Sequence, residues 1–161
     1  IPQDAQLWQG TLRQNLDPLH QYSDEDLYRV LEQARLQSIV DGHSAGLLQP
    51  VSEGGSNFSS GQRQLMCIAR ALVRRSSILV LDEATSSIDL DTDALIQKIV
   101  RSEFSGTTIT IAHRLNTIMD SDRVIVMREG KVAEFDAPST LLKNKDGLFY
   151  SMAREAGLVS T

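Results

Sequence analysis

The 161-residue sequence has only one cysteine, Cys67, and no apolar run that approaches the roughly 20 residues needed to cross a bilayer. A single cysteine cannot form an internal disulfide, so the composition fits a reducing compartment. No signal-peptide pattern opens the chain, and any membrane association must come through other segments or chains. The net charge of -5 argues against nucleic acid as a main partner.

The sequence also lacks a Walker A phosphate loop, which requires Gly-x-x-x-x-Gly-Lys followed by Ser or Thr. The one Gly-Lys pair, Gly130-Lys131, is followed by Val132, and Ile125 stands where the first glycine is needed. A hydrophobic fraction of 41% over this length is enough for one core, so one domain is expected.

The first half of the chain is predicted to be helical. Ser23, with Asp26 three residues later, is a capping arrangement in front of an apolar stripe with helical spacing. That first stripe is Leu27, Val30, Leu31 and Ala34. A glycine-containing irregular loop separates it from a second helical stripe. The second stripe is Leu65, Ile68, Ala69, Leu72 and Val73.

The second half alternates strands and helices. Ile78–Leu81 is a continuous apolar run, as in strands that helices cover on both faces. Thr107–Ile111 and Val124–Met127 are further β-rich runs, and Glu129-Gly130 is a tight turn into Lys131–Phe135. A covering helix is predicted from the stripe Leu95, Ile96, Ile99 and Val100. The pattern predicts an α/β fold with a mainly parallel sheet and active residues at the carboxyl ends of its strands.

Two motifs in this frame point to phosphate chemistry. Ser59-Ser60-Gly61-Gln62 opens the second helix, where free backbone N–H groups and the positive end of the helix dipole can receive a phosphate. The first strand ends in Asp82-Glu83, which can supply one carboxylate to a magnesium shell and one to a water molecule. Taken singly, the serine is an ordinary N-cap and the acidic pair a solvated turn. Their order, with one helix between them, favours nucleotide hydrolysis.

These motifs resemble those of the nucleotide-binding domain of ATP-binding cassette transporters, in the order of that family. Ser59 to Gln62 matches the signature loop, and Ile78–Glu83 resembles the Walker B strand with its catalytic glutamate. Ser86-Ser87-Ile88-Asp89 is similar to the D-loop, and Ile111-Ala112-His113-Arg114 to the switch-histidine loop. Ile1-Pro2-Gln3-Asp4 resembles the Q-loop.

The subfamily is indicated by Gly10–Pro18, which resembles the C subfamily that contains the multidrug-resistance-associated proteins. The signature departs from the commonest form at Phe58, where leucine is usual, and at Ser60, where glycine is usual. A degenerate signature beside an intact Asp-Glu pair resembles the second cassette of that subfamily.

The resemblance implies a P-loop NTPase-type cassette that lacks its N-terminal Walker A portion. We expect residues 1–161 to be a partial nucleotide-binding domain that begins just before the Q-loop region at 1–18. A helical subdomain with the signature is expected at 19–75, and a core with Walker B, the D-loop, the switch histidine and C-terminal helices at 76–161. Without the P-loop strand, an apolar face would stay uncovered and the isolated chain would be prone to aggregate.

The resemblance also implies a role for each candidate residue. Asp82 would hold Mg²⁺ through water, and Glu83 would act as the general base on the attacking water. His113 would bond the γ-phosphate of ATP and align that water. Gln3 would reach both the magnesium and the water through its amide group. ATP and Mg²⁺ are therefore the expected ligands.

Other chains are implied as partners. In the family, the loop formed by Ser59, Ser60, Gly61 and Gln62 faces ATP held on a second nucleotide-binding domain, and Asp89 would lie at the same interface. Transmembrane domains would be the other partners and would select the substrate. The chain would then lie on the cytoplasmic face of a plasma, vacuolar or other organellar membrane, as part of an ATPase motor for transport.

Two alternatives stay open from the sequence. The chain could be a truncated, non-catalytic cassette, from a pseudogene or a split gene, that binds no ATP tightly alone. It could instead belong to the cassette ATPases of DNA repair and chromosome structure, which share Walker B and the signature. The second alternative is disfavoured because no long coiled-coil insertion separates Gln3 from the signature, and because Asn15–Pro18 is typical of the C subfamily.

Overall fold

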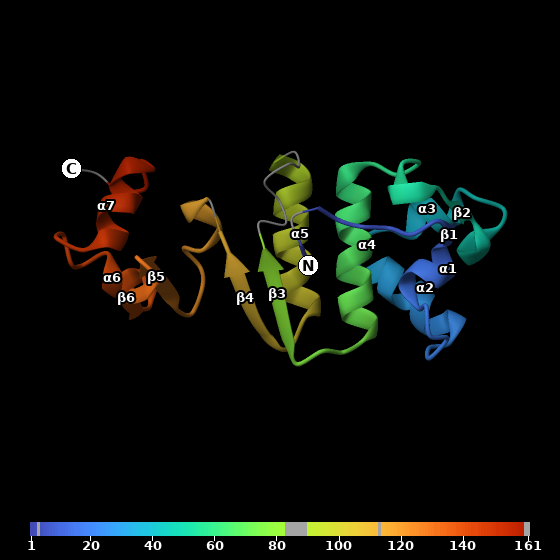
Figure 1. Ribbon diagram of the computed structural model, residues 1–161, viewed down its shortest axis with the longest axis horizontal. Coiled ribbons are helices and arrows are strands. Elements are labelled where there is room, and N and C mark those ends of the chain that lie inside the picture. Colours follow the sequence, from blue (N-terminus) through green and yellow to red (C-terminus); the bar gives the residue numbers. More distant parts are fainter. Residues whose placement is uncertain (3, 83–89, 113, 160–161) are drawn as a thin grey trace. The chain divides into compact units, whose positions relative to one another are not determined.

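The computed structural model describes residues 1–2, 4–82, 90–112 and 114–159 (Figure 1). Their contacts divide the chain into two compact units, Ile1–Ile111 and Ala112–Thr161. Among the helices of the described residues, none is long and apolar enough to cross a membrane. The elements in chain order are β1 (Gly10–Thr11), α1 (Leu12–Leu16), α2 (Asp24–Gln33), α3 (Gln37–Asp41), η1 (Gly46–Leu48), β2 (Pro50–Val51), η2 (Glu53–Gly55), α4 (Ser60–Val73), β3 (Ile78–Asp82), α5 (Leu90–Glu103), β4 (Thr107–Ile111), η3 (Leu115–Thr117), β5 (Val124–Arg128), β6 (Lys131–Asp136), α6 (Pro138–Leu141) and α7 (Leu148–Glu155).

The predicted first helix is α2, and its cap is confirmed. The Ser23 hydroxyl accepts a hydrogen bond from the backbone N–H of Asp26, and three acidic residues in the first turn favour the positive end of the helix dipole. The four residues of the predicted stripe are all buried in the core of the first unit. Burial of this one face is what holds a helix of only 10 residues in place.

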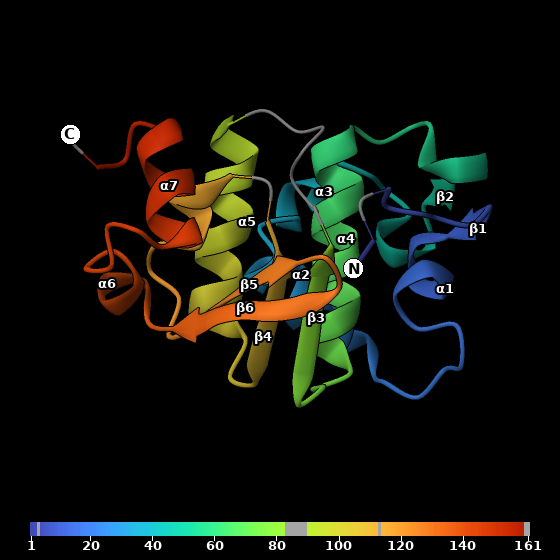
Figure 2. The ribbon, with the colours of Figure 1, turned by 60° about the vertical axis from the view of Figure 1, so that its left-hand side comes forward.

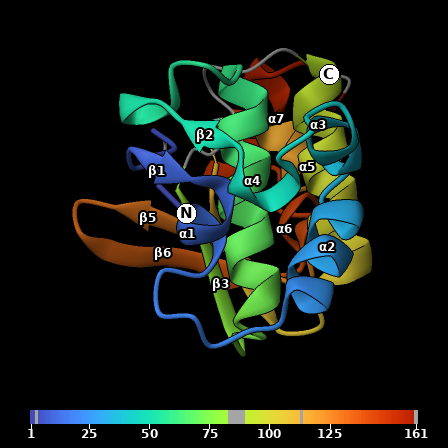
Figure 3. The ribbon, with the colours of Figure 1, turned by 90° about the vertical axis from the view of Figure 1, so that its right-hand side faces the viewer.

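The predicted second helix is α4, which lies at the centre of the first unit. It stands between the sheet of β3 and β4 on one side and the helices α1 to α3 on the other (Figures 1 and 3). All five residues of its predicted stripe are buried. Ser59 caps the helix through a reciprocal arrangement with Gln62, in which each side chain bonds the other residue's backbone N–H.

Strands β3 and β4 are parallel, as predicted, with Val80 opposite Ile109. The expectation that helices cover both faces of β3 is wrong for this structure. Leu79 and Leu81 are buried, but Ile78 and Val80 point to the other face and are 60% and 44% exposed. The reason is that α4 and α5 both lie on the same side of the two strands (Figure 2), and side chains alternate between the faces of a strand.

The expectation of a mainly parallel sheet holds only for β3 and β4. The described strands form three two-stranded sheets, and β1–β2 and β5–β6 are antiparallel. The hairpin predicted at β5–β6 is confirmed. Glu129 and Gly130 both have positive φ, 51° and 75°, as a type I′ turn requires, and such a turn returns the chain antiparallel to itself. In this second unit, Phe149 of α7 packs with buried residues of β5.

The segment that resembles the C subfamily is held by buried polar side chains. Asp17 is 2% exposed, and its two carboxylate oxygens accept the backbone N–H groups of Gln21 and Tyr22 at 3.1 and 2.9 Å. Burial alone would raise the pKa of Asp17, but these two N–H donors and the nearby Arg13 guanidinium together hold it below its usual value. The turn after α1 therefore depends on an ionised carboxylate.

Asp17→Asn should destabilise the chain by about 1–3 kcal/mol at pH 7, because the amide group can accept only one of the two N–H groups. The stabilisation by Asp17 is present above about pH 4, the pKa of an unfolded aspartate, and is lost as the pH falls through the lower pKa of the folded state. The difference between wild type and variant should therefore shrink below pH 4. Urea unfolding of the dilute 161-residue chain, followed by circular dichroism, measures both effects.

Asp24→Asn is the control for this change, since Asp24 is exposed and bonds only the Arg13 side chain. It should leave the free energy of unfolding nearly unchanged. A similar loss in both variants would show that Asp17 has no special role.

The open face of β3 and β4 gives a second prediction. Ile78, Val80, Ile109 and Ile111 are all at least 44% exposed and lie on one face of two neighbouring strands. Exposed contiguous apolar surface favours association, so the isolated 161-residue chain should self-associate. Replacing Val80 and Ile109 together by threonine should reduce association while keeping β-branched side chains in the strands. Light scattering after size exclusion measures the extent of association. A monodisperse wild-type monomer that melts cooperatively would contradict the prediction.

Candidate functional site

The amino-terminal end of α4 presents backbone donors to solvent. Ser59 and Ser60 are exposed, and among the described residues nothing accepts a hydrogen bond from the N–H groups of Ser60 and Gly61. The N–H group of Gln62 is already bonded to the Ser59 hydroxyl at 3.1 Å. Among the described residues, the N–H group of the exposed Ser60 is therefore a candidate donor to an anion, whereas Gly61 is buried and the N–H group of Gln62 is held by the cap.

The glycine of this loop has a steric role that the sequence did not predict. Gly61 is buried, and a Cβ atom at this position would stand 2.7 Å from Cγ2 of Thr92 in α5. That distance is shorter than van der Waals contact allows, so α4 and α5 can approach this closely only with glycine here. The close packing of α4 against α5 at Gly61 therefore helps to position the backbone N–H groups at the start of α4.

Asp82 lies at the carboxyl end of β3 with an exposed side chain, and β4 ends opposite it at Ile111. The start of the chain pairs with the same strand. The backbone nitrogen of Ile1 donates to the Val80 carbonyl at 2.6 Å, and the N–H group of Asp82 donates to the Ile1 carbonyl at 3.0 Å. The structure therefore brings residues Ile1 and Pro2, which precede the predicted Q-loop glutamine, beside the predicted magnesium ligand.

Four of the predicted site residues lie outside the described residues: Gln3, Glu83, Asp89 and His113. Their roles stay predictions. Three of them are close in sequence to described residues at this edge. Gln3 comes two residues after Ile1, Glu83 comes directly after Asp82, and His113 comes two residues after the end of β4. Within the described residues, no group of three or more His, Cys, Asp or Glu side chains could hold a metal ion.

Sequence reasoning missed Arg70, whose side chain connects α4 with the residues after the predicted Q-loop. Its guanidinium donates to the Gln6 carbonyl at 2.8 Å and to the Asn15 carbonyl at 2.6 Å. Partial burial lowers the pKa of Arg70 from its usual value, and burial likewise raises the pKa of the adjacent Cys67 thiol. An arginine in the last turn of a helix ordinarily compensates the helix dipole, so the sequence offered no signal for this contact.

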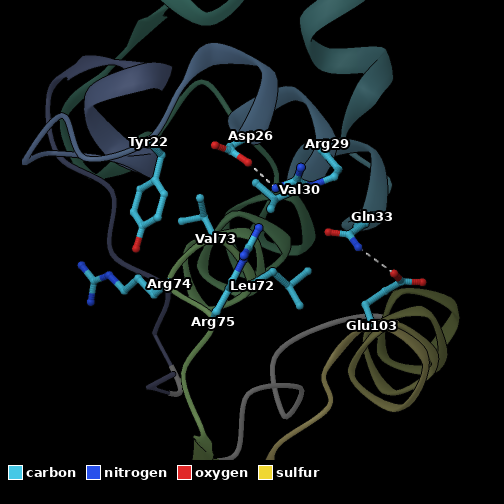
Figure 4. A pocket seen from close by; sticks show the side chains of 10 residues that line it. All are labelled: Tyr22, Asp26, Arg29, Val30, Gln33, Leu72, Val73, Arg74, Arg75 and Glu103. Atoms are coloured by element: carbon cyan, nitrogen blue, oxygen red, sulfur yellow. Dashed lines mark hydrogen bonds and ion pairs between the residues drawn. The ribbon is translucent and has the colours of Figure 1, made fainter.

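A cavity described in the structure lies elsewhere. It measures about 430 Å³ and lies between α2, the carboxyl end of α4 and the end of α5 (Figure 4). Arg29 bonds Asp26 there, and Gln33 bonds Glu103 at 3.0 Å. Since α4 separates this cavity from the signature residues by its full length of 14 residues, the cavity is not the predicted ATP site.

Comparison with known proteins supports the resemblance. The sequence profile described as "ABC transporter" matches residues 1–86, which is more than half of the chain. The chain is 58% identical over 159 residues to rat "ATP-binding cassette sub-family C member 2", which covers 98% of this chain and 10% of the rat protein.

Two yeast proteins match over the same region. The "Metal resistance protein YCF1" of Saccharomyces cerevisiae is 54% identical over 162 residues, and the "Vacuolar heme ABC transmembrane exporter abc3" of Schizosaccharomyces pombe is 52% identical over 160. Each match covers 99% of this chain and 11% of the yeast protein. The chain thus spans about a tenth of the length of these relatives. On the profile match and these identities, the chain belongs to the ABC transporter family, and its relatives are members of the C subfamily.

Proposed function

We propose that this chain is part of the ATP-binding and ATP-hydrolysing motor of a C-subfamily exporter, from its second cassette. The observation that carries the proposal is the edge where Asp82 ends β3 beside Ile1 and opposite the end of β4. Asp82 lies at this edge, and the other residues proposed for hydrolysis, Gln3, Glu83 and His113, are within two positions of Ile1, Asp82 and Ile111 in the sequence. The names of the relatives, one of which is an exporter, support coupling to transport.

The exposed carboxylate of Asp82 fits a magnesium ion held through water, as phosphoryl transfer requires. The ion would neutralise charge on the phosphate oxygens when bound. Glu83 takes a proton from the attacking water, whose oxygen bonds the γ-phosphorus while the bond to ADP breaks. His113 and the Gln3 amide align the water. Each of these steps places a charge or a donor where the transition state needs it.

The start of α4 fits a second role, toward ATP held by another nucleotide-binding domain. The N–H groups of Ser60 and Gly61 and the Ser59 hydroxyl would contact its γ-phosphate, with Asp89 at the same interface. A phosphate that also recruits the N–H group of Gln62 must displace the Ser59 hydroxyl from its cap. The Ser60 side chain adds bulk beside the phosphate, and we propose that this lowers the efficiency of that site. The chain then works on the cytoplasmic face of a membrane, with transmembrane domains as its other partners.

The general base can be tested in the full-length protein. Glu83→Gln should lower magnesium-dependent ATPase turnover by about 10²–10⁴-fold while ATP binding persists, because glutamine cannot accept the proton. Glu129→Gln is the matched control, since Glu129 is an 86% exposed residue in the β5–β6 turn, and it should keep full turnover. Unaltered turnover in Glu83→Gln would rule the proposal out.

The close approach at Gly61 can be separated from phosphate binding. Gly61→Ala should destabilise the protein by about 1–3 kcal/mol, because the added methyl group meets Cγ2 of Thr92. Combining it with Thr92→Ser, which removes that methyl group and keeps the hydroxyl, should restore most of the lost stability. Thermal unfolding measures the rescue, and ATPase turnover that recovers in parallel would assign the defect to packing. A variant that regains stability without turnover would place the defect at the phosphate contact.

A further inference from the structure

Arg70 forms a fork of hydrogen bonds that all reach one stretch of chain. Its Nε donates to the Asn15 carbonyl at 2.6 Å, one terminal nitrogen donates to the Gln6 carbonyl at 2.8 Å, and the other donates to Oδ1 of Asn15 at 2.9 Å. Its Cζ atom lies 4.5 Å from the centre of the Trp8 ring. Apart from a long contact to Cys67 in its own helix, these contacts all go to residues 6–15.

The side chain of Asn15 holds this stretch of residues together as one rigid unit. It is 1% exposed, and its Nδ2 donates to the carbonyls of Trp8 and Thr11 at 2.8 and 3.0 Å. Its Oδ1 accepts from the N–H group of Trp8 at 2.9 Å as well as from Arg70. A buried network in which every member is satisfied is rigid. We call residues 6–15 the tethered segment.

The start of the chain is bonded to β3 and also, through one long contact from Nε2 of Gln64 to the Pro2 carbonyl at 3.4 Å, to α4. Ile1 pairs with β3 through two backbone hydrogen bonds, at 2.6 and 3.0 Å. The few residues from Pro2 to Ala5, which include the proposed Gln3, therefore connect an end bonded to the strand of Asp82 with an end bonded to α4. Relative movement of α4 and β3 would act on these residues as well as on residues 74–77, which join the two elements directly.

We propose that Arg70 is a positioning residue that makes the tethered segment follow α4, so that phosphate contact at the start of α4 repositions the chain next to Gln3. The inference rests on the proposed function. The first turn of α4 and Arg70 are about 15 Å apart along one helix at 1.5 Å per residue, and a helix moves as a rigid rod. A three-pronged planar fork transmits rotation as well as translation, which a single hydrogen bond cannot do.

The test is hydrogen exchange of the full-length protein, with and without ATP and magnesium, in wild type and Arg70→Lys. Lysine keeps the charge and the stem but cannot bond Gln6 and both Asn15 oxygens at once. In wild type, ATP should protect amides of α4 and of the tethered segment together. In Arg70→Lys, α4 should still respond, while the response of the tethered segment should fall by about 2- to 30-fold, the range typical of altered coupling.

Two further variants separate coupling from folding. Arg74→Lys is the matched control, because Arg74 is an exposed arginine one turn further along the same helix end, and it should behave as wild type. Arg70→Met should lose the response of the tethered segment as fully as Arg70→Lys. In both Arg70 variants the KM for ATP should stay near the wild-type value while transport-substrate stimulation of turnover falls.

Different results would contradict the inference and the proposed function on which it rests. A tethered segment that still follows α4 in Arg70→Lys rejects Arg70 as the coupling residue and leaves the proposed function standing. An Arg70→Lys variant whose α4 also stops responding, with a parallel loss of thermal stability, assigns Arg70 a structural role only. Absence of any ATP response at α4 in wild type rejects the proposed function and the inference together.

Discussion

The burial of α4 is the constraint on which the rest of the first unit depends. Its residues pack on one side against the parallel strands and α5 and on the other against the helices α1 to α3 (Figure 3). An apolar side chain such as Leu65 or Ile68 cannot leave this position without exposing the core to water. The helix therefore holds its two ends at defined places, and both ends carry polar groups with specific partners.

The two ends of α4 make different contacts. At its start, the Ser59–Gln62 cap satisfies part of the helix end and leaves Ser60 exposed, next to a close contact between Gly61 and Thr92 that a larger residue would disturb. In its last turn, Arg70 bonds carbonyl groups that lie 55 and 64 residues away in the chain. The same helix thus joins a candidate phosphate contact to the residues that follow Gln3.

Much of the local structure followed from the sequence because its causes are local. The cap at Ser23, the buried stripe from Leu27 to Ala34 and the turn at Glu129-Gly130 each depend on residues within a few positions of one another. The parallel pairing of β3 and β4 also followed, because a strand, a helix and a strand in succession favour it. The exposed face of β3 agrees with the expectation that an apolar face would stay uncovered without the P-loop strand, but the apolar run itself could not show it, because such a run looks the same whether helices cover one face or two.

For the site, the sequence by itself determined the order and chemistry of the motifs: a capped helix start with small residues, and a strand that ends in two carboxylates. It also determined family membership, through the profile match over residues 1–86 and identities of 52% and 58% to two of its relatives. Only the tertiary structure decided that Ile1 lies against Val80 and Asp82, that Gly61 meets Thr92, and that the Arg70 guanidinium reaches Gln6 and Asn15. These contacts join residues far apart in the chain, and their partners are selected by packing and by the need to satisfy buried polar groups, neither of which leaves a periodic trace in the sequence.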